Sequence, residues 1–238
     1  MEYGICNLAV IPLRAEANDK SEEVSQILFG EAFEILEWTE RWVKVITAND
    51  NYEGWIGRLQ FVMLGHMDFN DLKQNPPPIT YRAVTQAWKK TDNSVVYLPV
   101  GSSLVFLKGT TCQINNEEFE IIGEIGETAS LDMIAKSFLN SPYLWGGRTH
   151  YGIDCSGFTQ AVFKLQGTYL SRDAWMQAEQ GIVVDFLAEA KLGDLAFFDN
   201  AEGKITHVGI MLNNEQIIHA SGRVKIDRID SQGIYSEE

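Results

Sequence analysis

The spacing of apolar residues changes along the chain and predicts two kinds of structure. Up to about residue 65, short apolar or alternating runs follow one another closely, with turn residues between them. Short strands at close spacing are typical of a small barrel. We therefore predict an all-β barrel over residues 1–65, with strands inside the runs at 5–13, 26–31, 32–38, 42–46 and 52–57.

The middle of the chain holds a polar stretch and then a second set of apolar runs. Residues 66–80 are polar and contain three consecutive prolines. Proline favours extended backbone and cannot continue a strand ladder, so we interpret 66–80 as a linker. We interpret residues 81–125 as a second, degenerate barrel unit, with an extension of the first barrel as the alternative. The strands expected in it lie at 95–101, 103–107 and 119–122.

Residues 126–238 change from helical to strand spacing. Ser130 stands before apolar residues at helical spacing, and a second such set, from Phe158 to Leu165, predicts a helix that begins close to Cys155. A third, short helix is expected from Ser171. Strands are then expected at 195–199, 208–212, 216–220 and 224–229. Helices followed by an antiparallel sheet indicate an α+β fold.

The composition narrows the classes of partner. The 238 residues carry a formal net charge of −14, and such a surface repels nucleic acid and anionic membranes, so neither is an expected partner. The three cysteines are odd in number and widely spaced, which argues against a disulfide framework. The sequence contains no CxxC pair that would indicate a zinc site. The first residues show no basic segment followed by a long apolar one. We therefore expect no signal peptide and a cytoplasmic protein.

Cys155 is the candidate nucleophile. A thiol at a helix N-terminus lies at the positive end of the helix dipole, which favours the thiolate. The preceding Gly146 and Gly147 allow a tight approach of another backbone. A lone cysteine before an apolar helix is otherwise a packing residue, and this is how we interpret Cys6 and Cys112, which lack polar flanks.

Two histidines lie on strands that a turn connects. His207 and His219 stand among apolar residues on either side of Asn213 and Asn214. Neighbouring strand positions can place both rings on one face. One imidazole then takes the thiol proton while the other orients it. The alternatives are two core histidines, or a zinc site with Cys155 that lacks an evident fourth ligand.

Four motifs in one order resemble the NlpC-type cysteine peptidase family. They are Asp-Cys-Ser-Gly-Phe at 154–158, Gly-Asp-Leu-Ala-Phe-Phe at 193–198, Thr-His-Val-Gly-Ile at 206–210 and Ile-His-Ala-Ser-Gly at 218–222. The resemblance covers roughly 110 residues and implies a papain-like α+β domain over 126–238 that hydrolyses cell-wall peptides. It also implies that Cys155 is the nucleophile, His207 the general base and His219 the orienting residue, with no cofactor. Backbone N–H groups at the helix start would hold the oxyanion.

The order of the domains is similar to a narrower subgroup, the γ-D-glutamyl-L-diamino acid endopeptidases with an SH3-like domain. The resemblance implies cleavage between γ-D-Glu and diaminopimelate in murein peptides with a free N-terminal L-Ala, during peptidoglycan recycling, with the SH3-like domain closing one end of the cleft. The matching substrate-binding residues are Tyr52, Glu22, Trp145, Asp154, Ser156, Arg172 and Asp173. Asp154 and Asp173 are expected to pair an ammonium group, and Arg172 to grip a carboxylate. Otherwise Arg172 and Asp173 cap a helix and Tyr52 belongs to the barrel core.

Other functions stay open at this point. An exported hydrolase of intact murein, an amidase or acyltransferase of the same fold, and a peptide-binding module over an inactive catalytic domain fit the same motifs. The chain also departs from its relatives. It ends soon after the strand expected near Ile229, where related enzymes carry a further basic strand, so we expect either an uncovered sheet edge or a shortened variant.

Overall fold

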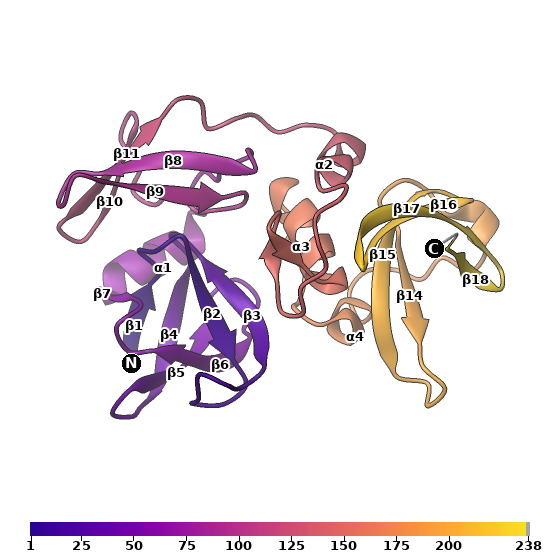
Figure 1. Ribbon diagram of the computed structural model, residues 1–238, viewed down its shortest axis with the longest axis horizontal. Helices are drawn as coiled ribbons and strands as arrows, with labels where there is room; N and C mark the ends of the chain where they lie inside the picture. The colour runs from indigo at the N-terminus through magenta and orange to yellow at the C-terminus, as the bar shows by residue number, and fades with distance from the viewer. Residues whose placement is uncertain (237–238) are drawn as a thin grey trace. The chain divides into compact units, whose positions relative to one another are not determined.

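The computed structural model describes residues 1–236, which form two compact units that meet in the sequence between Glu127 and Thr128. Figure 1 shows the elements of both. The first unit is all-β apart from one helix, and the second is α+β. The predicted fold class, an all-β region followed by an α+β region, is confirmed. Across the described residues, no helix is long and apolar enough to cross a bilayer.

The first unit begins with a seven-stranded sheet in the order β3-β2-β6-β5-β4-β1-β7. Alternating residues of these strands, among them Ile11, Leu13, Val43 and Val45, point inward and are fully buried. This period of two is the pattern that predicted the strands. The strands are β1 (Glu2–Ile5), β2 (Val10–Arg14), β3 (Glu23–Leu28), β4 (Ala32–Trp38), β5 (Trp42–Thr47), β6 (Glu53–Gly57) and β7 (Val62–Leu64).

A helix occupies much of the stretch that we predicted as a linker. α1 spans His66–Gln74, so the linker prediction over 66–80 is wrong for these residues. Phe69 is the buried residue of α1, and its ring stacks on Tyr3 with the ring centroids 4.0 Å apart. A helix with a single buried residue carries no apolar stripe, which is why the sequence pattern did not show it.

A second, four-stranded sheet in the order β10-β11-β8-β9 completes the first unit. It shares a core with the first sheet, where the rings of Phe29 and Phe119 meet edge to face at 5.0 Å. The strand predicted at 103–107 is absent, because these residues form turns with one isolated bridge at Ser103. The strands are β8 (Val84–Lys89), β9 (Ser94–Pro99), β10 (Thr111–Ile114) and β11 (Glu117–Ile122).

The second unit packs short helices against a five-stranded antiparallel sheet whose strand order follows the chain. Its helical elements are α2 (Leu131–Ser137), α3 (Cys155–Leu165), α4 (Ala174–Gln177) and the 3₁₀ turn η1 (Leu187–Glu189). A small hairpin of β12 (Arg148–Thr149) and β13 (Gly152–Ile153) precedes α3. The sheet comprises β14 (Leu195–Asp199), β15 (Ile205–Asn213), β16 (Gln216–Ser221), β17 (Arg223–Asp230) and β18 (Gly233–Tyr235). α3 packs against β15 and β16.

The last strand corrects the expectation of an uncovered sheet edge. β18 pairs antiparallel with β17, with Ile229 opposite Ile234. The chain turns back on itself immediately after β17 and covers that edge with three residues. A strand this short shows no alternation in the sequence, so the pattern gave no sign of it.

Candidate active site

Cys155 is the first residue of α3 and is buried, with 6% of its surface exposed. Asp154 is the N-cap, and its Oδ1 accepts the backbone N–H of Gly157 at 2.7 Å. A Cβ atom on Gly157 would lie 2.2 Å from the carbonyl oxygen of Gly147. A Cβ atom on Gly147 itself would lie 2.4 Å from the carbonyl oxygen of Gly152, so the expectation that Gly147 allows a tight approach of another backbone is confirmed.

The Asp154 carboxylate is fully engaged with neighbouring groups. Its Oδ2 accepts the backbone N–H of Gly146 at 2.8 Å and the Nη2–H of Arg172 at 2.6 Å, and Arg172 Nη1 lies 3.1 Å from Oδ1. Arg172 Nη1 also donates to Ser156 Oγ at 2.8 Å, and Arg172 is only 1% exposed. A buried ion pair of this kind neutralises both charges in place.

This geometry joins three of the predicted substrate-binding residues to one another. Arg172 faces the Asp154 carboxylate. Ser156 shares the same cluster. The three side chains hold the start of α3, and with it the thiol, in a fixed position, and their contacts with a substrate stay predictions.

A second buried network, which the sequence did not reveal, joins α4 to the start of α3. Gln177 of α4 is 1% exposed and donates from Nε2 to the carbonyl oxygens of Ser156 at 3.1 Å and Ser171 at 2.8 Å. Thr159 Oγ1 of α3 donates to Gln177 Oε1 at 2.7 Å. The amide of one residue thus fixes the loop that carries Arg172 against the helix that carries Cys155.

The two histidines lie together on neighbouring strands. His207 of β15 and His219 of β16 face one another with Nε2 of the first 2.8 Å from Nδ1 of the second. Their planes cross at 79°. Gly209 lies directly opposite His219, and a Cβ there would come within 2.8 Å of the His219 Cβ. Because glycine has no Cβ, this position leaves space for the His219 side chain on the neighbouring strand.

Asp227 of β17 extends the line of contacts and was not predicted. Its Oδ2 lies 3.0 Å from His219 Nε2 and 3.3 Å from Lys225 Nζ. Both nitrogens of His219 are therefore engaged, one with His207 and one with Asp227, which argues against the alternative zinc site. The sequence held one signal for Asp227, because Lys225 and Asp227 stand two apart on an expected strand and so share a face.

Burial sets the protonation of the site. It lowers the pKa of His207 to about 4, together with the neighbouring His219. Burial also lowers the pKa of His219, although the Asp227 carboxylate opposes this. Both rings are therefore neutral at neutral pH. Burial alone would raise the pKa of Asp227, but hydrogen bonds from His219 and Lys225 outweigh it and lower the pKa.

The thiol is also neutral in the free protein. Burial and then the Asp154 carboxylate raise the pKa of Cys155, against the opposing effect of the backbone N–H groups of Val208 and Ser156. Burial therefore acts against the helix dipole, which favours the thiolate. Val208, the residue after His207, packs against Cys155 and brings β15 to the thiol.

The remaining predicted residues lie at several places. Trp145 is 58% exposed in the loop before α3, and Asp173 is the half-buried N-cap residue of α4. Tyr52 and Glu22 belong to the first unit, where Tyr52 packs against the core and Glu22 is exposed. Their role at the substrate amine stays a prediction. Tyr143 was not predicted as a site residue: burial first, and then electrostatic interaction with Cys155 and Asp154, raise the pKa of its phenol to about 12.

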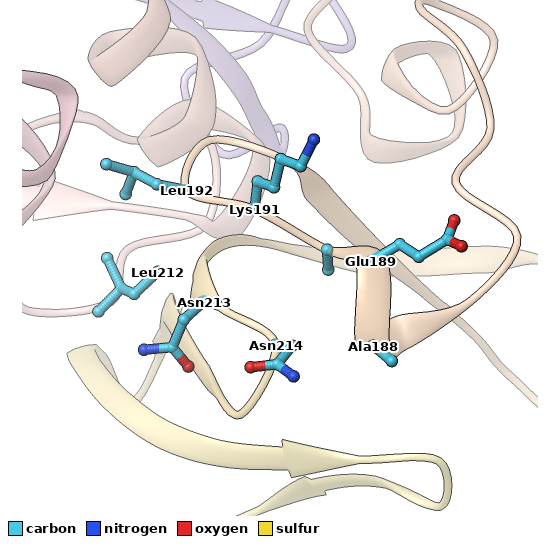
Figure 2. Close-up of a pocket in the computed structure, with 8 residues that line it drawn as sticks. Ala188, Glu189, Lys191, Leu192, Leu212, Asn213 and Asn214 are labelled. Carbon is cyan, nitrogen blue, oxygen red and sulfur yellow. The ribbon is translucent and has the colours of Figure 1, made fainter.

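One open pocket of about 540 Å³ lies apart from these residues, beside η1 and the turn between β15 and β16. Figure 2 shows Glu189, Lys191 and Asn213 on its walls. Asn213 ends the strand that carries His207, and six positions of extended chain span roughly 20 Å. The pocket is therefore not part of the thiol site.

Comparison with known proteins places this geometry in context. The model of the NlpC/P60 family matches residues 140–237, and that of the bacterial dipeptidyl-peptidase SH3 domain matches residues 13–58. The gamma-D-glutamyl-L-lysine dipeptidyl-peptidase of Bacillus subtilis is 29% identical over 214 residues, covering 82% of this chain and 71% of that protein. Dipeptidyl-peptidase 6 of Lysinibacillus sphaericus is 28% identical over 254 residues, covering 92% of this chain and 89% of that protein.

A solved structure shares the fold. The crystal structure of an NlpC/P60 family protein from Bacillus cereus superposes with a TM-score of 0.81 over 97% of this chain and 95% of that chain. The two sequences are 19% identical, so the likeness concerns the fold alone.

Proposed function

We propose that this chain, which matches the NlpC/P60 family behind a bacterial SH3 domain, is a cysteine peptidase that cleaves the bond between γ-D-Glu and the diamino acid of murein peptides. The observation that carries the proposal is the arrangement of a thiol at the start of α3 beside the strand that holds His207, which His219 orients. A nucleophile, a base and an orienting group in this order are the parts of covalent catalysis.

The reaction follows from the neutral resting state. His207 takes the Cys155 proton as the sulfur attacks the γ-carbonyl carbon of D-Glu, and the charge that develops on the carbonyl oxygen faces backbone N–H groups at the start of α3. The C–N bond then breaks, His207 returns the proton to the departing amine, and a thioester remains on Cys155. Water then attacks the thioester and gives a proton to His207. The C–S bond breaks, L-Ala-γ-D-Glu leaves as the carboxylic acid, and His207 returns the proton to the sulfur.

The proposed substrate is a short peptide with a free amino end. The B. subtilis and L. sphaericus relatives are named dipeptidyl-peptidases, enzymes that release two residues from an amino end, which supports L-Ala-γ-D-Glu as the released dipeptide. Since Asp154 and Arg172 are paired with one another, Asp173 is the residue of the second unit that we propose for the amine. For the third residue we propose diaminopimelate. The B. subtilis relative is named for L-lysine, and both belong in the assay.

The test compares L-Ala-γ-D-Glu-L-Lys with the diaminopimelate peptide, and each with its N-acetylated form. We expect release of L-Ala-γ-D-Glu from the free peptides, little release from the blocked ones, and none with Cys155→Ala. Cys112→Ala is the matched control, since Cys112 is a buried thiol of the first unit. No dipeptide from either peptide, or equal release by Cys155→Ala, would refute the proposal.

The blocked peptides also separate two cellular roles. An enzyme of peptidoglycan recycling, which we propose, acts on released peptides with free amino ends. Equal cleavage of N-acetylated peptides or of intact murein would favour the exported wall hydrolase instead.

A further inference from the structure

Asp227 stands at the end of a continuous line of side chains that crosses three strands. The line runs from His207 on β15 through His219 on β16 to Asp227 on β17, with contacts of 2.8 Å and 3.0 Å. His219 is 3% exposed, so water does not compete for its ring nitrogens. Lys225, which lies opposite His219 in the sheet, contacts the same Asp227 oxygen that faces His219.

The charge of Asp227 decides which nitrogen of each histidine in this line carries the proton. A carboxylate only accepts hydrogen bonds, whereas a neutral imidazole donates from one nitrogen and accepts at the other. His219 must therefore carry its proton on Nε2 and leave Nδ1 as an acceptor. His207 must then donate from Nε2. The nitrogen of His207 that remains free to accept a proton is Nδ1.

Without Asp227 the contact between the histidines has two equivalent solutions. In the second, His219 carries its proton on Nδ1 and donates to His207 Nε2, which places the proton of His207 on Nδ1. The 2.8 Å contact is satisfied equally well, but His207 then has no lone pair left to take the proton of a thiol. A negative charge beside His219 Nε2 removes this second solution.

We propose that Asp227 is a positioning residue that fixes the tautomers of His219 and His207 and so makes His207 Nδ1 the base for Cys155. The catalytic consequence rests on the proposed function, whereas the tautomers themselves do not. Lys225 helps to orient the side chain at position 227, because an ammonium group only donates hydrogen bonds and so an accepting oxygen must face it.

Two substitutions separate this role from simple packing. Asp227→Asn keeps an oxygen that accepts from both His219 and Lys225, because a side-chain NH₂ turned toward the ammonium would meet another donor. Asp227→Leu fills similar space and accepts nothing. We expect Asp227→Leu to lower kcat at least ~2-fold with KM little changed, since about half of the population loses the base when the two tautomer arrangements become equivalent, and Asp227→Asn to keep a kcat close to that of the parent. Asp230→Leu, which removes an exposed carboxylate of the same strand, is the control.

The decisive reading is spectroscopic and needs no substrate. Nitrogen NMR of the ¹⁵N-histidine-labelled full chain distinguishes a protonated from an unprotonated ring nitrogen. We expect Nε2–H on both histidines in the parent and in Asp227→Asn, and Nδ1–H on a substantial share of His207 in Asp227→Leu. Nδ1–H on His207 of the parent, unchanged tautomers in Asp227→Leu, or equal loss of kcat in both variants would overturn the proposal. If the peptidase proposal fails, the parent spectrum still decides the tautomers, and it does so even if Asp227→Leu does not fold.

Discussion

Replacing Arg172 by methionine tests whether the buried pair with Asp154 holds the catalytic helix in place. The change removes three contacts, two to Asp154 and one to Ser156, and leaves a carboxylate that is 5% exposed without its counter-charge. Breaking a buried ion pair from one side typically costs about 3–5 kcal/mol, because the remaining charge stays buried. We expect a loss of this size in the stability of the second unit.

The assay is hydrogen exchange followed by mass spectrometry on peptides of α3, because it reports on this unit alone. A loss of 3–5 kcal/mol corresponds to exchange of the slowest α3 amides that is faster by between about 10² and 10⁴-fold. Lys136→Met is the matched control. It breaks an exposed pair with Asp132 in the same unit, which should cost less than ~1 kcal/mol.

The double variant with Asp154→Asn separates the pair from its surroundings. Once the carboxylate is neutral, Arg172→Met should cost much less than it does in the parent. A cost below ~1 kcal/mol for Arg172→Met alone, or the same cost with and without Asp154→Asn, would show that the pair does not secure the helix.

Three further results are expected. Burial raises the pKa of the Cys155 thiol and lowers that of His207 to about 4. Alkylation of Cys155 by iodoacetamide should therefore accelerate only as the pH rises into the alkaline range. A plateau of the alkylation rate between about pH 5 and pH 7 would instead reveal a thiolate–imidazolium pair. In an NMR titration His207 should protonate near pH 4. The free energy of unfolding should fall as the pH drops from about 6.5 to about 4, since the unfolded chain takes up the proton before the folded chain does. A midpoint near 6.5 for His207 would contradict this. Gly157→Ala should lower the melting temperature and the activity, with a cost of about 1–3 kcal/mol, because the new methyl group would lie 2.2 Å from the Gly147 carbonyl oxygen; an unchanged melting curve would show that the two backbones can separate.

The sequence predicted those features that local pattern encodes. Short apolar runs predicted most strands of the first sheet, although the run at 5–13 contains parts of both β1 and β2 and β7 was not predicted. Helical spacing predicted the start of α3 close to Cys155. The turn between β15 and β16 placed His207 and His219 on adjacent strands, where the structure has them in contact. In each case neighbouring residues carry the information.

The features that the sequence did not predict depend on contacts between distant residues or on very short elements. Arg172 has the charge of a ligand-binding residue, and only its approach to Asp154, 18 residues earlier, shows that it is a buried support. Asp227 is one of two acidic residues on β17, and only the sheet shows that it is the one beside His219. α1 and β18 were missed because a polar helix with one buried residue and a three-residue strand carry almost no periodicity.

The central claim is that Cys155 attacks the peptide and becomes acylated. The most direct measurement is the mass of the protein, and of its peptide containing Cys155, after rapid mixing with L-Ala-γ-D-Glu-L-Lys or the diaminopimelate peptide and quenching in acid. We predict a transient mass increase that corresponds to the L-Ala-γ-D-Glu acyl group on Cys155 and that is absent from Cys155→Ala. Consumption of the peptide with Cys155 unmodified at every time point, or with the same rate in Cys155→Ala, would contradict the account.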